Sequence, residues 1–217
     1  MAKSILLIVS ALFPIVNPIG GSPIFLLLTQ EYSSGARRLL ARRVAINSFI
    51  LLIVSVVVGT HILSFFGISL PVVQVGGGLV VISTGWAMLT QSDSGASGDR
   101  SHMHQAMNPQ DIFGEAFYPL TLPLTVGPGS ISIAITLGAN EPRHLGANLI
   151  SILTATIGAL VIAISVYLCY GYADRLAAVI GTSGMNVILQ LSSFLLVCIG
   201  VQIFWNGLSA LAKTLRI

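Results

Sequence analysis

The chain has 217 residues, of which 54% are hydrophobic and only 8% are charged, and its mean hydropathy is +0.92. This composition excludes an ordinary soluble domain, in which about a quarter of the residues carry charge. The net charge of +3 comes from few residues that lie between apolar runs, so it indicates membrane topology rather than nucleic-acid binding. Alternating strand patterns separated by turns are absent, which argues against an outer-membrane barrel.

Apolar segments long enough to cross a hydrocarbon core of about 30 Å, which takes about 20 helical residues, occur six times. An arginine-rich polar loop at 29–43 follows the first segment, and a longer polar stretch at 91–111 follows the third. We therefore expect an all-α polytopic membrane protein. The expected spans are Ser4–Leu28, Val44–Phe66, Pro71–Thr90, Ile112–Ala139, Leu149–Tyr172 and Asn186–Leu211.

Prolines and glycines interrupt the first span at its centre, between Phe13 and Pro23. A proline lacks an N–H and clashes with the carbonyl four residues earlier, so Pro18 leaves the carbonyl of Pro14 without its helical partner. In hydrocarbon, such a carbonyl is costly unless protein, water or a ligand satisfies it. Broken backbone at membrane depth is therefore typical of segments that line a cavity.

The fourth span is interrupted in the same way, by Pro119, Pro123 and Pro128 together with Gly127 and Gly129. Two interrupted spans in corresponding positions of two halves indicate a transporter binding site. The alternative is a pair of proline kinks that only shape helix packing, with small residues that allow helices to approach closely.

The two halves of the chain resemble one another beyond these interruptions. The turn at 67–69 precedes Gln74 as the turn at 181–183 precedes Gln190. Because three spans are an odd number, a second copy must run inverted in the membrane, which brings the two broken helices together near the midplane. We expect a first three-helix repeat at 1–90, a polar connecting loop at 91–111 and a second, inverted repeat at 112–217.

The interrupted segments supply the candidate binding groups. A half-helix that begins at Pro18 or Pro128 would present free N–H groups and the positive end of its dipole. Neither segment contains Asp, Glu, Lys or Arg, so such a site suits a small solute with both charges or none, for example a neutral amino acid. The residues predicted to bind the solute are Asn17, Pro18, Gly20, Thr125, Gly127, Pro128, Gly129, Gln74 and Gln190.

Other polar and small residues in the spans could serve either solute binding or helix packing. Gln74 and Gln190 either contact solute or hydrogen-bond a neighbouring helix, and the sequence leaves both open. The run Gly76–Gly78 favours close helix packing over a hinge. Tyr167 and Tyr170 are typical of packing or interface residues.

We predict no enzyme, no cofactor and no metal. His102 and His104 lie near aspartates in the polar connection, but their spacing matches no familiar metal site. Cys169 and Cys198 form neither a disulfide framework nor a metal motif. Glu115 is close to an apolar segment but only a few residues past the polar loop, so it is interpreted as an interfacial charge. The chain has no nucleophile–base pair and no phosphate-binding loop in a strand–helix context.

Orientation is predicted from the basic residues. Arg37, Arg38, Arg42 and Arg43 form a short, dense group, which the positive-inside rule puts in the cytoplasm. An even number of spans then leaves both termini in the periplasm.

Several short segments spread over the chain occur together in one known family. They are Asn17–Gly20, Phe66–Leu70, Gly77–Gly78, Pro119–Leu120 with Pro123, Gly127–Gly129, Phe194–Gln202 and Asn206–Gly207. In these segments the chain resembles the MarC family of bacterial inner-membrane proteins. The resemblance implies six spans, a place near small neutral amino-acid transporters, and a likeness to exporters built from two inverted three-helix repeats. The family often has arginine where this chain has Gln74 and Gln190, so substrate or coupling would differ here if those arginines bind solute.

The function expected from the sequence is a secondary transporter or exporter of a small solute such as a neutral amino acid. Its expected partners are that solute and the lipid bilayer, and no nucleic acid is expected. The sequence does not decide whether the protein forms a homo-oligomer. Two rivals stand beside it: a non-transporting structural or regulatory membrane protein, and a membrane enzyme or redox carrier.

Overall fold

The computed structural model describes residues 2–30, 32–90, 112–139 and 145–214. Helices account for 92% of these residues, and none of them lies in a strand, so the predicted all-helical class is confirmed. The helices are α1 (Ala2–Val16), α2 (Pro18–Leu28), α3 (Ser34–Phe65), α4 (Leu70–Thr90), α5 (Ile112–Phe117), the π-helix η2 (Leu120–Thr125), α6 (Pro128–Ala139), α7 (Leu145–Gly171) and α8 (Ala173–Thr214).

Five segments of the described chain are long and apolar enough to cross a bilayer. The expected fourth span is not among these five, because its interruption divides it into α5, η2 and α6, and the longest piece has only 12 residues. The five segments are Ala2–Leu28, which holds both α1 and α2, Ser34–Phe65, Leu70–Thr90, Ile150–Gly171 and Ser183–Lys213.

One predicted boundary is wrong. The polar stretch at 29–43 is mostly helical, because α3 begins at Ser34 and its N-cap Ser33 accepts a hydrogen bond from the backbone of Ala36 at 3.3 Å. Arginine is a good helix former, so the arginine-rich segment continues the apolar helix beyond the expected membrane boundary. The turn expected at 181–183 takes the form of a kink between two parts of α8, where Gly181 has a φ of +73°.

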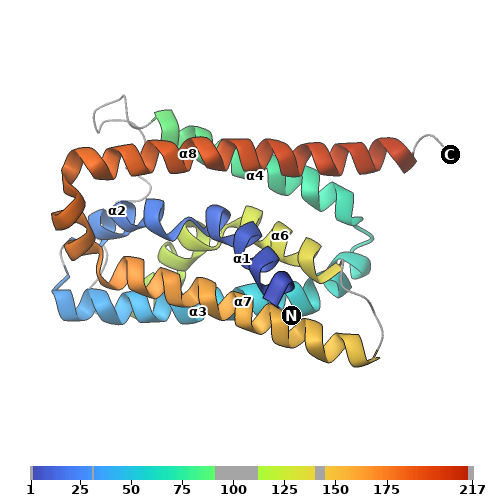
Figure 1. Ribbon diagram of the computed structural model, residues 1–217, viewed down its shortest axis with the longest axis horizontal. Helices are drawn as coiled ribbons and strands as arrows, with labels where there is room; N and C mark the ends of the chain where they lie inside the picture. Colours follow the sequence, from blue (N-terminus) through green and yellow to red (C-terminus); the bar gives the residue numbers. More distant parts are fainter. Residues whose placement is uncertain (1, 31, 91–111, 140–144, 215–217) are drawn as a thin grey trace.

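In Figure 1 the helices form three levels from top to bottom. α4 packs most extensively against α8, and α3 packs against α7. The interrupted helices α1, α2 and α6 lie between these two pairs and contact both of them. The core is centred on α3 and α7, where Leu40, Val44, Leu52, Ile162 and Val166 are completely buried. The interrupted segments therefore lie between two pairs of long helices.

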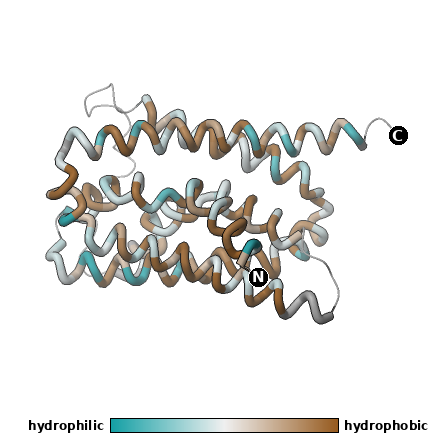
Figure 2. The backbone as a smooth tube through the Cα atoms, in the orientation of Figure 1, coloured by the Kyte–Doolittle hydropathy of each residue, from teal (hydrophilic) through white to brown (hydrophobic). Residues whose placement is uncertain are grey.

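Large apolar side chains cover the outer faces of the helices. Leu6, Phe65 and Trp86 are among many that are more than half exposed. Figure 2 shows hydrophobic residues along the lengths of the helices and hydrophilic residues toward their ends, for example at the start of α3. Such surfaces suit lipid, because water would make each exposed apolar side chain unfavourable by about 25 cal/mol per Å².

The α4–α8 pair is antiparallel and depends on glycine. Gly78 faces the backbone nitrogen of Phe204, and a Cβ built on Gly78 would lie only 2.5 Å from that atom. Gly200 faces the backbone nitrogen of Ile82 in the same way, at 2.7 Å. Because each helix presents bare backbone to the other, the two axes approach closely, as small residues allow in membrane helices. Gly85 and Gly207 repeat this arrangement seven residues further along each helix.

Gly78→Ala should therefore destabilise the protein, whereas Gly76→Ala should not. The added methyl group at position 78 meets backbone that cannot rotate away, and overpacking of this kind costs about 1–3 kcal/mol. A Cβ at position 76 meets nothing within 4 Å. Thermal unfolding of both variants in detergent micelles would test the difference, and equal midpoints would contradict this account of the α4–α8 interface.

Candidate functional site

The first interruption is built around Asn17. Asn17 has left-handed backbone angles (φ 47°, ψ 58°), which asparagine tolerates better than most residues. Its side-chain oxygen accepts a hydrogen bond from the backbone N–H of Gly20 at 3.1 Å and so caps α2. A Cβ on Gly20 would collide with the Asn17 side chain. Pro18 is the first residue of α2, so its missing N–H leaves no gap in the helical hydrogen bonds.

The side-chain amide nitrogen of Asn17 is buried, and no described residue accepts a hydrogen bond from it. Leaving a buried donor unpaired costs about 1–3 kcal/mol, so this atom is a natural partner for a bound acceptor. By contrast, the carbonyl of Ile19, which Pro23 deprives of its helical donor, accepts a hydrogen bond from the Ser22 hydroxyl at 2.8 Å. The first interruption therefore satisfies a carbonyl internally but leaves one amide donor free.

The second interruption uses π-helical hydrogen bonds and threonine hydroxyls. Leu122 has extended backbone angles inside η2, and the N–H of Val126 bonds to the carbonyl of Thr121 five residues earlier, at 2.9 Å. Thr125 donates its hydroxyl to the carbonyl of Leu120 at 2.7 Å. The wide turn thus accommodates the prolines at membrane depth without stranding these carbonyls.

Tyr170 of α7 links the two interruptions. Its hydroxyl oxygen lies 3.1 Å from the Thr125 hydroxyl, and a Cβ on Gly21 would lie 2.5 Å from that same tyrosine oxygen. Its ring stacks on Phe25 of α2 with the centroids 4.6 Å apart. Because Thr125 already gives its single hydrogen to Leu120, the tyrosine hydroxyl is the donor to Thr125. The fully buried Tyr170 therefore fills the space where α2 and η2 meet.

The start of α6 packs against α4. Gly127 accepts a hydrogen bond from the N–H of Ile131 at 3.1 Å and precedes Pro128, the exposed first residue of α6. Gly129 is buried, and a Cβ there would collide with Val81 of α4. One turn later, the Ser132 hydroxyl donates to a backbone carbonyl of α4, that of Val73, at 2.9 Å. Of the three predicted site residues here, Gly129 packs against α4, whereas Gly127 caps the start of α6 and Pro128 is exposed.

The two predicted glutamines lie away from the interruptions. Gln74 of α4 is half-buried, and its Cβ faces Gly207 of α8. Gln190 is exposed on α8. Since Gly85 of α4 faces Ser193 of α8, the antiparallel pairing puts Gln74 and Gln190 at opposite ends of this pair. The structure does not bring the glutamines together.

The interpretation of Tyr170 as an ordinary packing residue missed its position between the interruptions. Only its polar hydroxyl within an apolar span could have indicated a specific partner, because buried tyrosine hydroxyls usually find one. Glu115, His102 and His104 fall where the structure describes no side chain. Among the described residues, no group of His, Cys, Asp and Glu has the geometry for a metal ion.

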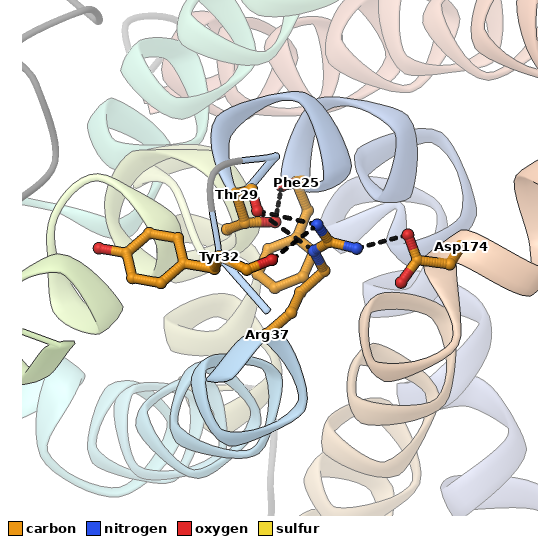
Figure 3. A network of polar contacts seen from close by, with 5 residues as sticks. All are labelled: Phe25, Thr29, Tyr32, Arg37 and Asp174. Atoms are coloured by element: carbon orange, nitrogen blue, oxygen red, sulfur yellow. Dashed lines mark hydrogen bonds and ion pairs between the residues drawn. The ribbon is translucent and has the colours of Figure 1, made fainter. Parts of the chain in front are cut away.

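A polar network anchors the end of α2 (Figure 3). The Arg37 guanidinium of α3 donates to the carbonyl of Thr29, at 3.0 and 3.2 Å, and to that of Tyr32 at 3.2 Å. It also pairs with the Asp174 carboxylate at the start of α8. The Thr29 hydroxyl donates back to the carbonyl of Phe25 at 2.7 Å. Positive charge at a helix C-terminus is favourable, so Arg37 fixes α2 against α3 and α8.

The fold and the interruptions together define a polytopic helical membrane protein with enclosed breaks in its spans. Residues 2–212 match the model of the MarC family of integral membrane proteins, and the chain belongs to this family. No solved structure matches the chain.

The chain is similar to several named relatives over nearly its whole length. The UPF0056 inner membrane protein MarC of Salmonella typhimurium is 30% identical over 215 residues, which cover 98% of this chain and 97% of the relative. The UPF0056 membrane protein YvbG of Bacillus subtilis is 31% identical and covers 94% of each chain. A UPF0056 membrane protein of Archaeoglobus fulgidus is 29% identical over 200 residues.

Replacing Arg37 should destabilise the protein more than replacing its acidic partner. Arg37→Met removes hydrogen bonds from a side chain that is only 10% exposed, which should lower the free energy of unfolding by about 2–3 kcal/mol. Asp174→Asn weakens an ion pair whose acidic side chain is 50% exposed, and such pairs contribute about 0–1 kcal/mol. Thermal unfolding in micelles would measure both. Arg42→Met, at an exposed position of α3, is the matched control, and a larger effect of Asp174→Asn would contradict this assignment.

Proposed function

We propose that this protein is a secondary transporter of the inner membrane that moves a small neutral solute, such as a zwitterionic amino acid, by alternating access. The observation that carries the proposal is the link through Tyr170 between two interrupted helices that are far apart in the sequence. Membrane proteins retain broken helices of this kind where they line a solute pathway. The inner-membrane location follows that of the Salmonella relative, which is an inner membrane protein.

The proposed architecture has six spans in two inverted repeats. The fourth span consists of α5, η2 and α6 in sequence, and it is the counterpart of the interrupted α1–α2 span. The antiparallel α4–α8 contact and the pairing of α3 with α7 support this arrangement, because inverted repeats bring equivalent helices together. The arginine-rich start of α3 would face the cytoplasm, with both termini in the periplasm.

The proposed site suits a solute that is neutral overall. The free amide nitrogen of Asn17 and the first N–H groups of α2 and α6 would meet the solute carboxylate. The ammonium group would meet main-chain carbonyls near the interruptions. Since no charged side chain lies within either interruption, a solute with net charge would be left without a counter-charge.

The proposed movement separates the α4–α8 pair from the α3–α7 pair. The chain connects these pairs at Gly67, between α3 and α4, and at Gly181, at the kink of α8. Both glycines have positive φ, of 66° and 73°, and a Cβ on either would meet nothing within 4 Å. Free space and glycine together allow backbone rotation there, as hinge residues require. In the described conformation, Val16, Thr125 and Val126 are at most 2% exposed, which corresponds to a closed site.

The rival function, a structural or regulatory membrane protein without transport, also has an observation in its favour. Hydroxyl groups of Ser22, Thr121 and Thr125 already satisfy main-chain carbonyls at the interruptions. In this alternative, the breaks only adjust helix packing, and no solute is needed to complete them.

Uptake and efflux of labelled glycine, alanine, serine and threonine in proteoliposomes would test the transport proposal. We expect flux for at least one of these solutes, and we expect Asn17→Leu and Gly127→Leu to abolish it. Asn17→Asp is the sharper variant, because aspartate also tolerates left-handed backbone and caps helices but lacks the amide donor. It should lose flux by about tenfold or more, the value of one hydrogen bond to a charged group, and its unfolding midpoint would show whether the fold is kept.

Gly76→Ala serves as the control for this experiment, because position 76 faces open space. Unchanged flux in both leucine variants would remove the assigned site. Absence of flux of all four solutes in the unmodified, correctly folded protein would favour the structural rival.

Tyr170→Phe should raise the maximal rate of transport by about 2- to 10-fold. The variant removes the hydrogen bond to Thr125 that holds the closed arrangement, and one such bond contributes about 0.5–1.5 kcal/mol. The phenyl ring would still stack on Phe25, so the fold should remain intact. Tyr167→Phe, one turn earlier on the same helix, is the matched control, and equal rates for both variants would contradict a gating role for Tyr170.

A further inference from the structure

Two arginines from different helices meet over one aromatic ring at the arginine-rich end of the molecule. The guanidinium carbon of Arg38, in α3, lies 5.4 Å from the ring centroid of Tyr172, and that of Arg175, in α8, lies 5.6 Å from it. All three side chains are exposed. A cation–π contact at an exposed site is a weak attraction, so both guanidinium groups are drawn toward the same ring.

Neither of these two positive charges forms an ion pair with a described side chain. Their shared ring keeps the two guanidinium carbons within about 11 Å of one another, the sum of the two distances to its centroid. Asp174 is adjacent to Arg175 in sequence, but its carboxylate pairs with Arg37. An anion that contacts both Arg38 and Arg175 would give each of them an ionic partner.

The surroundings of the pair are apolar and lie at a membrane boundary. Tyr172 directly follows Gly171, the last residue of an apolar span. The first part of α8, before the kink at Gly181, runs across the end of the helix bundle instead of along it (Figure 1). In that segment Val179 is 85% exposed, and Leu39, beside Arg38, is 42% exposed. Exposed apolar side chains next to basic ones suit a ligand with a charged head and an acyl chain.

We propose that Arg38, Tyr172 and Arg175 form a binding site for the headgroup of an anionic phospholipid. The phosphate would lie between the two guanidinium groups, which bind phosphate oxygens in a bidentate manner. The acyl chains would lie along Val179 and Leu39. Basic sites between membrane helices are known to take anionic lipid headgroups. This lipid would join the starts of α3 and α8, the same two segments that the Arg37–Asp174 pair connects. The proposal is independent of the transport function.

Lipid titration would test the site. The purified full-length protein in neutral detergent would be titrated with phosphatidylglycerol, phosphatidylcholine or inorganic phosphate, and bound ligand would be counted by native mass spectrometry. We expect phosphatidylglycerol to bind, phosphatidylcholine to bind at least about tenfold more weakly, and phosphate to bind more weakly still. Phosphate binding as tight as that of phosphatidylglycerol would overturn the assignment to lipid.

Variants distinguish a built site from general charge attraction. The double variant Arg38→Gln with Arg175→Gln should weaken phosphatidylglycerol binding by about tenfold or more, since each basic residue near a lipid surface contributes a several-fold factor. Lys3→Gln with Lys213→Gln changes the net charge equally at other, exposed positions and should leave binding unchanged. Tyr172→Leu keeps both charges but removes the ring that positions them, and it should weaken binding several-fold.

Equal losses in the two double variants would overturn the proposal, as would unchanged binding in Tyr172→Leu. Because Arg38, Tyr172 and Arg175 are exposed, we expect their variants to keep the unfolding midpoint of the unmodified protein in lipid-free detergent. This measurement separates a lost lipid site from a lost fold.

Discussion

The rest of this structure depends on one constraint: a peptide group in an apolar medium must find a hydrogen-bond partner within the protein. Proline removes such a partner, and two of the spans carry prolines at their centres. The chain responds with local substitutes, namely the asparagine cap of α2, serine and threonine hydroxyls on freed carbonyls, and the wide turn of η2. These substitutes require enclosure, which explains why α1, α2 and α6 lie between two pairs of long helices.

The two enclosing pairs differ in how they hold together. The α4–α8 pair relies on glycines that let backbone touch backbone, with few fully buried side chains. The α3 and α7 helices instead form a core of large aliphatic residues and Tyr170. The two pairs are thus held by different kinds of contact, backbone against backbone in one and packed side chains in the other.

Polar interactions gather at two depths of the molecule. At the interruptions they are neutral: an amide, hydroxyls and main-chain groups. At the start of α3 they are charged, where Arg37 holds the end of α2 and its neighbour Arg38 reaches Tyr172. This separation follows from solvation, since ions are expensive inside the membrane and inexpensive at its surface. The charged end therefore anchors the helices, while the interruptions in the interior use neutral groups.

The sequence by itself determined the class of protein and the positions of the helix breaks. Both are local properties: the length of an apolar run sets a span, and a proline disrupts its own helical turn wherever it lies. The half-helices that begin at Pro18 and Pro128 were predictable for this reason. The sequence placed the start of α3 too late, because arginine disfavours the membrane but not the helix.

Only the tertiary structure decided which distant residues meet. It brought Tyr170 to Gly21 and Thr125, separated Gln74 from Gln190, and buried Arg37 against the end of α2. No local pattern carries these contacts, because they depend on the register and distance between helices that pack side by side. In an apolar chain nearly every residue suits the membrane equally well, so hydropathy cannot distinguish a side chain that faces lipid from one that faces another helix.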